Sequence, residues 1–367
     1  MDIETVAAAS IYLISTCNYY LNVHRSRLIK KNGAREGGGC CLYTKTEQKL
    51  CAKPSGEFSN FVQMSYGDFE YLLQKISPMV AKQDTYNWRD AVPVKVRLAV
   101  TLSLHYLFKI SRIIPEVCLA LNIVLKEMPT TSQEWLSKTG IFKFIHCVGA
   151  LDGKHVMILP PPHTGTEYFN YKGHFSIVLL ALVDSNYSFI GLKQKIDTIT
   201  INLPSPSLVP NSNTKLPYVF LADAAFVLNT HIMKPFPGHH AAGTPERLFY
   251  QTLSSSRVVV ENVFGIMSSV FRILKKPIPP DVSKASTITM TCVLLHNYLR
   301  KSKTSQHMYI PTGLLDRYVN GELILPGSWR KEDKGTCFDS LQHVPRRPPI
   351  SAVQVRLNFM NYIFNNH

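Results

Sequence analysis

The chain has 367 residues, 45% hydrophobic and 18% charged, so it can bury a substantial core. Forty Lys and Arg against 25 Asp and Glu give a formal net charge of +15, which favours nucleic acid first and an anionic membrane second, or else a basic surface with no specific ligand. The eight scattered cysteines form no Cys-x2-Cys pair, which excludes a zinc-finger pattern and a disulfide framework. They indicate reduced thiols in a cytosolic or nuclear protein.

Two apolar runs, at residues 6–14 and 175–183, are shorter than the roughly 20 residues that cross a bilayer. We therefore expect no membrane span. Basic residues follow the first run instead of preceding it, which disfavours a signal peptide. Residues 1–57 form a first region, a short helix followed by a basic, glycine-bearing linker. The basic cluster His24–Lys31 is a nuclear-import signal or a phosphate-contacting arm, unless it is only a solvated segment.

Residues 58–140 have the apolar spacing of helices. We predict helices over 66–76, 92–104 and 115–125, with Pro78 ending the first and Pro93 in the first turn of the second. Three short helices in succession are compatible with a helix-turn-helix that binds DNA, or with helices that pack together without binding DNA. Periodicity does not separate these interpretations.

The pattern then changes to strands, expected near 146–158, 174–183, 186–193 and 217–222, so we expect the sheet to come from the middle of the chain. Residues 198–215 are predicted to be a loop. Helices are predicted over 253–275 and 286–301. From about 303 the tail is proline-rich, predicted to be irregular, and closes with a helix over 353–364. The sequence therefore predicts a domain at 146–300 and a tail at 301–367.

Three acids stand out against this pattern. Asp152 lies inside a strand-like run, Asp223 ends a short apolar run, and Glu261 flanks the apolar stripe of a predicted helix. A carboxylate at a buried strand position costs several kcal/mol unless it is paired or binds a cation. Together the three acids suggest a cage for a hard divalent metal.

Each acid also has an ordinary structural explanation. The Asp152-Gly153 pair is typical of a hairpin turn, although the apolar pattern does not reverse there. Asp223 is a suitable N-cap for the segment that follows it. Glu261, considered alone, is a surface acid.

Several blocks, in order, resemble the DDE superfamily nuclease domain of PIF/Harbinger transposases and Harbinger transposase-derived nucleases. The similarity runs from about 146 to 300, and is weaker over 58–135. The blocks are Gly149–His155, Tyr168–Gly173, His174–Asp184, Val219–Phe226, Met233–Gly238, Ser256–Gly265, Phe271–Leu274 and Thr291–Leu299.

This resemblance implies an α/β, ribonuclease H-like fold, a central mixed sheet flanked by helices, here with an all-helical N-terminal region. It implies that Asp152, Asp223 and Glu261 are catalytic and hold two Mg²⁺ or Mn²⁺ ions about 3.5–4 Å apart for hydrolysis of DNA phosphodiester bonds. Lys154, His155, Lys172 and Arg257 become candidates for phosphate contacts.

The resemblance also implies DNA as partner, a separate Myb/SANT-like DNA-binding partner protein, and a location in the nucleus, with the cytoplasm as a second compartment. No oligomeric state follows from it. The family's segment after the third strand is shortened here near 191–197, and the helical region is shortened between 104 and 115. The alternative is therefore a domesticated, catalytically inactive DNA-binding or interaction protein, or a chain lacking segments of the real product.

Overall fold

The computed structural model describes residues 62–81, 93–103, 113–126, 133–134, 137, 142–193, 203–279, 281–319, 322–332, 337–343 and 347–366. The chain divides into two compact units. The first takes residues up to Lys126 with Val270–Ile273 and Thr287–Pro311, and the second takes Glu127–Ser269, Leu274–Ser286 and Thr312–His367. The predictions for residues 1–57 and for the two shortened connections fall on segments outside the described residues, wholly or in large part.

The first unit is helical, as predicted for this region. The helices in its described part are α4 (Tyr66–Val80), α5 (Val94–Ser103), α6 (Ile113–Val124) and α10 (Gln306–Tyr309), together with residues 287–301 of α9 (Val282–Lys301). Thr291 Oγ1 of α9 donates to Asn122 Oδ1 of α6 at 2.8 Å, which joins segments far apart in the sequence.

The prediction that Pro78 ends the first helix is wrong, because α4 contains Pro78 and continues to Val80. A proline in a helix removes one backbone hydrogen bond. In α4 the missing hydrogen bond lies in the last turn, so it interrupts little of the helix. Ile76 and Val80 lie four residues apart and are both buried, so the extra turn buries another apolar side chain.

The second unit contains a six-stranded mixed sheet in the order β3-β2-β1-β6-β7, with β10 also paired to β1. The β1–β6 and β6–β7 pairs are parallel, and the other pairs are antiparallel. The strands are β1 (Cys147–Met157), β2 (Ser176–Val183), β3 (Phe189–Lys193), β6 (Val219–Ala222), β7 (Ile232–Met233) and β10 (Phe338–Ser340). The predicted mixed α/β architecture is confirmed.

The start of β3 differs from the prediction by three residues. Residues 184–188 form a turn in which Asp184 Oδ1 accepts from the backbone N–H groups of Asn186 and Ser188, at 2.9 Å each. An aspartate that bonds its own following backbone favours a turn over continued pairing. Asp184 therefore belongs to the hairpin between β2 and β3.

The tail is more regular than predicted. It contains the hairpin of β8 (Arg317–Val319) and β9 (Glu322–Leu325), then α11 (Trp329–Glu332), β10 and α12 (Ile350–Asn365). The expectation of a sheet built only from the middle of the chain is therefore wrong by one strand. β10 pairs with Lys154–Val156, beyond the end of β6, where β1 would otherwise have an open edge. The predicted last helix is α12.

Two further short strands lie in the stretch predicted to be a loop. β4 (Ser207–Leu208) and β5 (Lys215–Leu216) form an antiparallel pair of their own.

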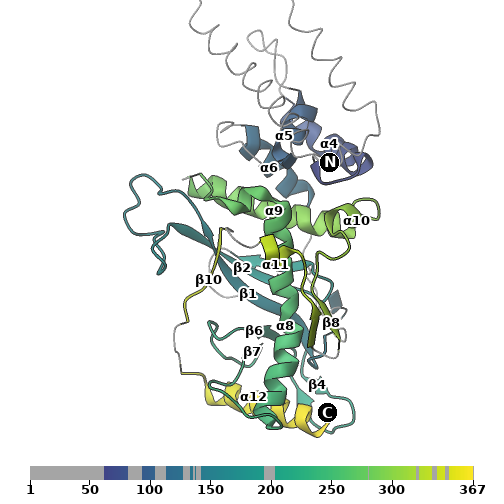
Figure 1. The fold of residues 1–367 in the computed structure, drawn as a ribbon, viewed down its shortest axis with the longest axis vertical. Helices are drawn as coiled ribbons and strands as arrows, with labels where there is room; N and C mark the ends of the chain where they lie inside the picture. The colour runs from purple at the N-terminus through teal and green to yellow at the C-terminus, as the bar shows by residue number, and fades with distance from the viewer. Residues whose placement is uncertain are drawn as a thin grey trace, which may run out of the picture. The chain divides into compact units, whose positions relative to one another are not determined.

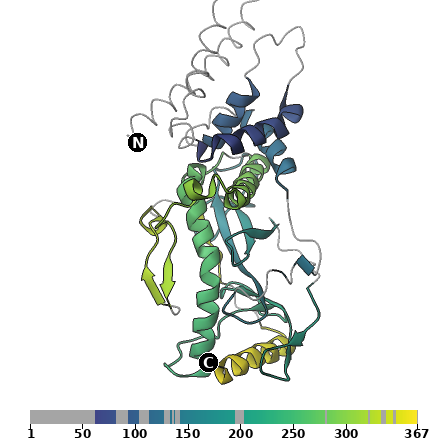
Figure 2. The same ribbon diagram turned by 90° about the vertical axis from the view of Figure 1, so that its right-hand side faces the viewer.

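Helix α8 (Pro245–Val270) runs along one face of the sheet, followed by the short helix η1 (Arg272–Lys275) (Figures 1 and 2). It begins eight residues earlier than predicted. Thr244 Oγ1 accepts from the Arg247 N–H at 3.3 Å, and a proline opens the first turn. The core between α8, α12 and the sheet contains Cys147, Leu221, Phe249, Leu253 and Phe359. This face of the sheet carries the candidate site.

Within the described residues, none of the helices has the length and apolar character that crossing a membrane requires. Four cysteines in the described part of the chain are buried and free, namely Cys118, Cys147, Cys292 and Cys337.

Candidate active site

Asp152 and Asp223 lie side by side because of the register of two parallel strands. Leu151 of β1 is paired with Ala222 of β6, and the two acids are the next residue on each strand. Successive side chains alternate between the faces of a sheet, so both carboxylates project from the same face. Leu221, two residues before Asp223, packs in the core formed with α8, which identifies this face as the one that α8 covers.

Asp152 is buried within β1, so it does not lie in a hairpin turn. Asp152 as a whole is only 3% exposed to solvent. Oδ1 accepts from the Gly153 N–H at 2.8 Å, whereas Oδ2 has no hydrogen-bond partner among the described residues. Lys154 Nζ lies 3.2 Å from Oδ2 and forms an ion pair with it. A buried carboxylate oxygen without a hydrogen bond is costly, and a cation would relieve that cost.

The charges around Asp152 oppose one another. Burial raises the pKa of Asp152, the nearby Lys154 and Arg257 lower it, and the Asp223 carboxylate raises it further. This electrostatic interaction between the two carboxylates agrees with the strand register. Two acids held together in this way repel each other unless a cation lies between them.

Asp223 directly follows β6, and residues 224 and 225 turn the chain away from the sheet. Its Oδ1 accepts from the Ala225 N–H at 2.9 Å, and its backbone oxygen accepts from the Phe226 N–H at 3.4 Å. Asp223 therefore caps a turn, and not the start of a helix as the alternative explanation had it. Its second carboxylate oxygen is left for another ligand, since no hydrogen bond involves that atom in the described structure.

Glu261 lies on α8 and is paired with another α8 residue. Arg257 Nη2 donates to Glu261 Oε1 at 2.5 Å, with side chains 20% and 35% exposed. The same arginine acts on the Asp152 carboxyl group, so its guanidinium is close to both acids. No group of three or more His, Cys, Asp or Glu side chains able to hold a metal occurs in the described part of the chain. The expected three-carboxylate cage is therefore not assembled in this structure.

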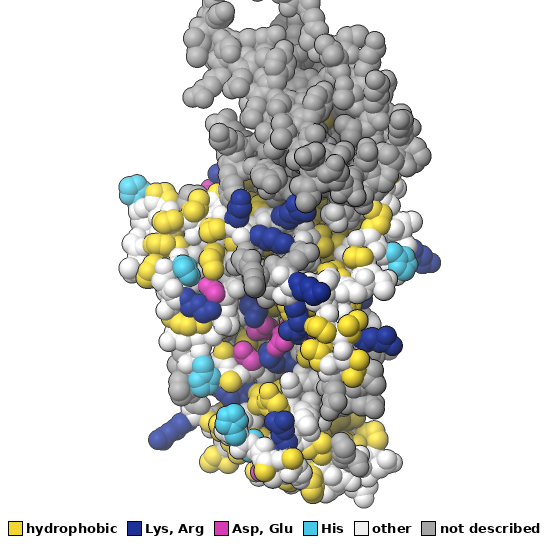
Figure 3. Space-filling view, in the orientation of Figure 1, with side chains coloured by type: hydrophobic (Ala, Val, Ile, Leu, Met, Phe, Trp, Pro, Cys, Tyr) yellow, Lys and Arg dark blue, Asp and Glu magenta, His cyan; other side chains and the backbone are white. Residues whose placement is uncertain are grey.

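The paired acids nevertheless have the chemistry of a cation site. Mg²⁺ is commonly held by one or two carboxylates together with water and substrate phosphates. Asp152 and Asp223 supply two such carboxylates, and among the described residues the buried Oδ2 of Asp152 has no hydrogen-bond donor. Figure 3 shows Asp and Glu side chains gathered on the α8 side of the sheet with Lys and Arg side chains around them. The two acids therefore suit a divalent cation. In this structure Lys154 and Arg257 neutralise part of the negative charge of the two acids.

The four candidate phosphate contacts are divided between the two faces of the sheet. Lys154 projects from the face of Asp152, and its Nζ lies 5.6 Å from the ring centroid of Phe264 on α8. Arg257 also belongs to this face. His155 projects from the other face, where its Nδ1 is 2.9 Å from Ser176 Oγ. Burial lowers the pKa of His155, which favours the neutral ring.

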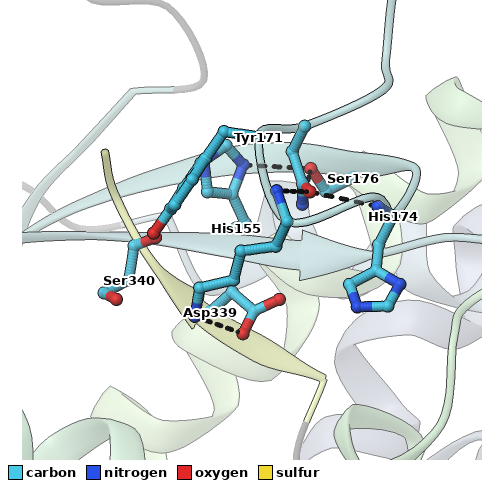
Figure 4. A network of polar contacts seen from close by, with 8 residues as sticks. His155, Tyr171, His174, Ser176, Asp339 and Ser340 are labelled. Atoms are coloured by element: carbon cyan, nitrogen blue, oxygen red, sulfur yellow. Dashed lines mark hydrogen bonds and ion pairs between the residues drawn. The ribbon is translucent and has the colours of Figure 1, made fainter.

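The network on the opposite face includes His155, Ser176 and Asp339 (Figure 4), and Lys172 joins it through Asp339. Its Nζ donates to Asp339 Oδ1 of β10 at 2.8 Å, and Asp339 is the register partner of His155. Tyr171 donates to the backbone oxygen of Ser340 at 2.9 Å. The sequence did not indicate Asp339, because a three-residue strand in a proline-rich tail has too little periodicity to be recognised.

The comparison with protein families adds to this geometry. Residues 151–297 match the DDE superfamily endonuclease model. All seven predicted site residues fall within the DDE endonuclease match, whose mixed sheet and flanking helices are consistent with a ribonuclease H-like fold. The comparisons with curated proteins and with solved structures gave no match.

The DDE endonuclease match supports a transposase-like nuclease in general terms, with DNA as the implied substrate. Such domains generally use divalent metals, which agrees with the character of the Asp152 and Asp223 pair.

Proposed function

We propose that this chain is a metal-dependent nuclease of the Harbinger-derived type that hydrolyses DNA phosphodiester bonds. Asp152, Asp223 and Glu261 are its catalytic and metal-binding residues in this proposal. The observation that carries it is the parallel register of β1 and β6, which brings two carboxylates together beneath α8. The DDE endonuclease match over the same residues supports the nuclease class.

The cofactor in this proposal is Mg²⁺ or Mn²⁺, two ions in the complete site, which would activate a water molecule and stabilise the leaving oxygen. Asp152 and Asp223 would hold this charge with the carboxylate oxygens that receive no hydrogen bond from the described residues. Glu261 is the third ligand in this proposal. Its Oε1 accepts a hydrogen bond from Arg257 in this structure, so this contact would have to break before Glu261 binds the cation.

The basic residues on the same face have a role in binding the substrate. Lys154 and Arg257 neutralise acids in the absence of metal, and a bound cation would free them to contact phosphates. His155 and Lys172, on the opposite face, remain candidates for contacts farther along the DNA. We further propose a nuclear location and a Myb/SANT-like partner that contributes DNA binding.

A second candidate function is a domesticated protein that binds DNA or a partner without cleaving. Two ion pairs favour it, Lys154 with Asp152 and Arg257 with Glu261, because they neutralise two of the three acids without a metal. In an inactive descendant these pairs would be permanent. In a nuclease they would open when the cation binds.

Nicking of a supercoiled plasmid with Mg²⁺ or Mn²⁺ distinguishes the two functions. The natural chain is compared with Asp152→Asn and Glu261→Gln, and with Asp281→Asn as a control, since Asp281 is an exposed acid that forms an ion pair with Lys284 and accepts from the Lys284 N–H at the start of α9. We expect metal-dependent nicking by the natural chain and the control, with loss of nicking but not of DNA binding in the two variants. A folded natural chain that binds DNA without nicking it would favour the domesticated protein.

A further inference from the structure

Lys234 holds the turn that follows Asp223. It comes directly after β7, whose Met233 is paired with Leu221 of the neighbouring β6. Its Nζ donates to the backbone oxygen of Ala224 at 3.0 Å and to that of Phe226 at 2.9 Å. One ammonium group therefore binds two carbonyl groups from the turn beside the candidate cation ligand.

This turn sets the direction of the Asp223 carboxylate. The Ala225 N–H donates to Asp223 Oδ1 at 2.9 Å, so the position of that backbone determines where the carboxylate lies. The two carbonyls bound by Lys234 belong to the residues on either side of Ala225. If these carbonyls lost their donor, they would turn toward water, and the peptide that orients Asp223 would move with them.

The segment that carries Lys234 is itself held by the C-terminal helix. Arg356 of α12 donates to the backbone oxygen of Pro235 at 3.3 Å, and its guanidinium carbon lies 4.1 Å from the ring centroid of Phe236. Arg356 is only 9% exposed. The support for Asp223 therefore passes from α12 through residues 234–236 to the turn.

We propose that Lys234 is a positioning residue that orients the Asp223 carboxylate for the divalent cation by binding the carbonyls of Ala224 and Phe226. The inference rests on the proposed function, because it takes Asp223 as a cation ligand. A lysine acting only through its charge would repel the cation, and removing it would strengthen binding. A positioning lysine has the opposite effect, because its loss disorders a ligand.

Titration of Mn²⁺ into the folded full chain, followed by calorimetry, separates these effects. Lys234→Met is expected to raise the Kd for Mn²⁺ by about 10-fold or more, the size of effect seen when a group that orients a metal ligand is removed. Lys234→Arg keeps both charge and donors, and its Kd should stay within about 3-fold of the natural chain. Lys276→Met, which removes an exposed lysine, is the matched control for the lost charge.

Lys234→Gln covers the case in which the methionine variant fails to fold. It keeps an N–H donor without the charge, and its Kd should rise above that of Lys234→Arg. The Mg²⁺ concentration for half-maximal nicking should rise in parallel, while the nicking rate at saturating Mg²⁺ recovers.

Unchanged or tighter Mn²⁺ binding by the folded Lys234 variants would overturn the positioning role. That result leaves the proposed function intact if Asp223→Asn abolishes Mn²⁺ binding. Equal binding by Asp223→Asn and the natural chain would instead overturn Asp223 as a ligand, and the proposed function with it.

Discussion

Asp152 and Asp68 are two acids in different surroundings, and their contrast separates the proposed cation ligand from a carboxylate that is satisfied by hydrogen bonds within the fold. Asp68, in α4 of the first unit, accepts hydrogen bonds from five hydroxyl groups, those of Ser65, Tyr298, Ser302, Thr304 and Ser305. Asp152 is more deeply buried, yet its Oδ2 has no hydrogen-bond donor in the described structure. The fold therefore supplies five hydroxyl donors to Asp68, whereas it supplies no hydrogen-bond donor to Asp152 Oδ2 among the described residues.

The pKa values of the two acids shift in opposite directions. Burial acts to raise the pKa of Asp68, but the hydrogen bonds from its serine and threonine neighbours outweigh this effect and lower it. Burial raises the pKa of Asp152, and its two basic neighbours only partly oppose the rise. Asp68 therefore stabilises its unit, whereas Asp152 is a position that favours a further cation.

The largest expected effect concerns activity. Asp152→Asn should lower the rate of metal-dependent plasmid nicking by at least about 100-fold, because it removes a carboxylate that we propose binds the metal directly. Asp68→Asn should leave the rate per folded molecule within about 3-fold of the natural chain, since that acid binds hydroxyl groups in the first unit. An equal loss of nicking in both variants, with both folded, would remove the distinction between the two acids.

Lys154→Met tests whether a cation can replace the lysine beside Asp152. In the presence of a chelator the variant should be less stable by about 1–2 kcal/mol, because a largely buried carboxylate loses its ion pair. Saturating Mn²⁺ should reduce the difference in the free energy of unfolding between the variant and the natural chain, since the metal stabilises the folded state that binds it. Chemical denaturation with and without Mn²⁺ measures both differences, and a gap of the same size in both conditions would contradict the idea.

Asp68→Asn should lower the free energy of unfolding of the helical unit by roughly 1 kcal/mol at neutral pH, because hydrogen bonds to a charged acceptor are weakened. The folded-state pKa of Asp68 lies below its ordinary value of 3.8, so its contribution is complete above that pH and is lost as pH falls through the folded-state pKa. Unfolding followed from pH 7 to pH 2 should show a shallower acid dependence in the variant. An identical acid dependence would mean that Asp68 does not contribute as described.

Lys172→Met should have the smallest effect on stability, below about 1 kcal/mol, because the ion pair with Asp339 is partly exposed. If Lys172 contacts a phosphate as predicted, the slope of log Kd for DNA against log salt concentration should become shallower by about 0.9. An unchanged slope would limit the role of Lys172 to holding β10.

The sequence predicted the regular parts of this site well. The strand and helix patterns around Asp152, Asp223 and Glu261 correspond to β1, β6 and α8, because each element has a strong apolar periodicity. The side-by-side position of Asp152 and Asp223 depends on strand register, which the strand positions alone do not specify.

Other features depend on contacts between distant segments. The β10 strand joins β1 from nearly two hundred residues away, and Lys234 binds a turn that its own sequence neighbourhood does not reveal. The pairing of Glu261 with Arg257 is visible as a spacing of four residues on a helix, yet the sequence does not show whether a metal or the arginine holds the acid. The pairing of β10 with β1 and the contacts of Lys234 are not encoded in local sequence preferences, so they become visible only in the three-dimensional structure.

Calorimetric titration of Mn²⁺ into the natural chain and into Asp152→Asn tests the central claim most directly, since the claim is that this acid is a cation ligand. We predict binding to the natural chain and its loss, by at least about 10-fold in Kd, in the folded variant. Asp68→Asn serves as the second acid variant and should bind Mn²⁺ as the natural chain does. Equal binding by the natural chain and Asp152→Asn, or no binding by either, would contradict the account.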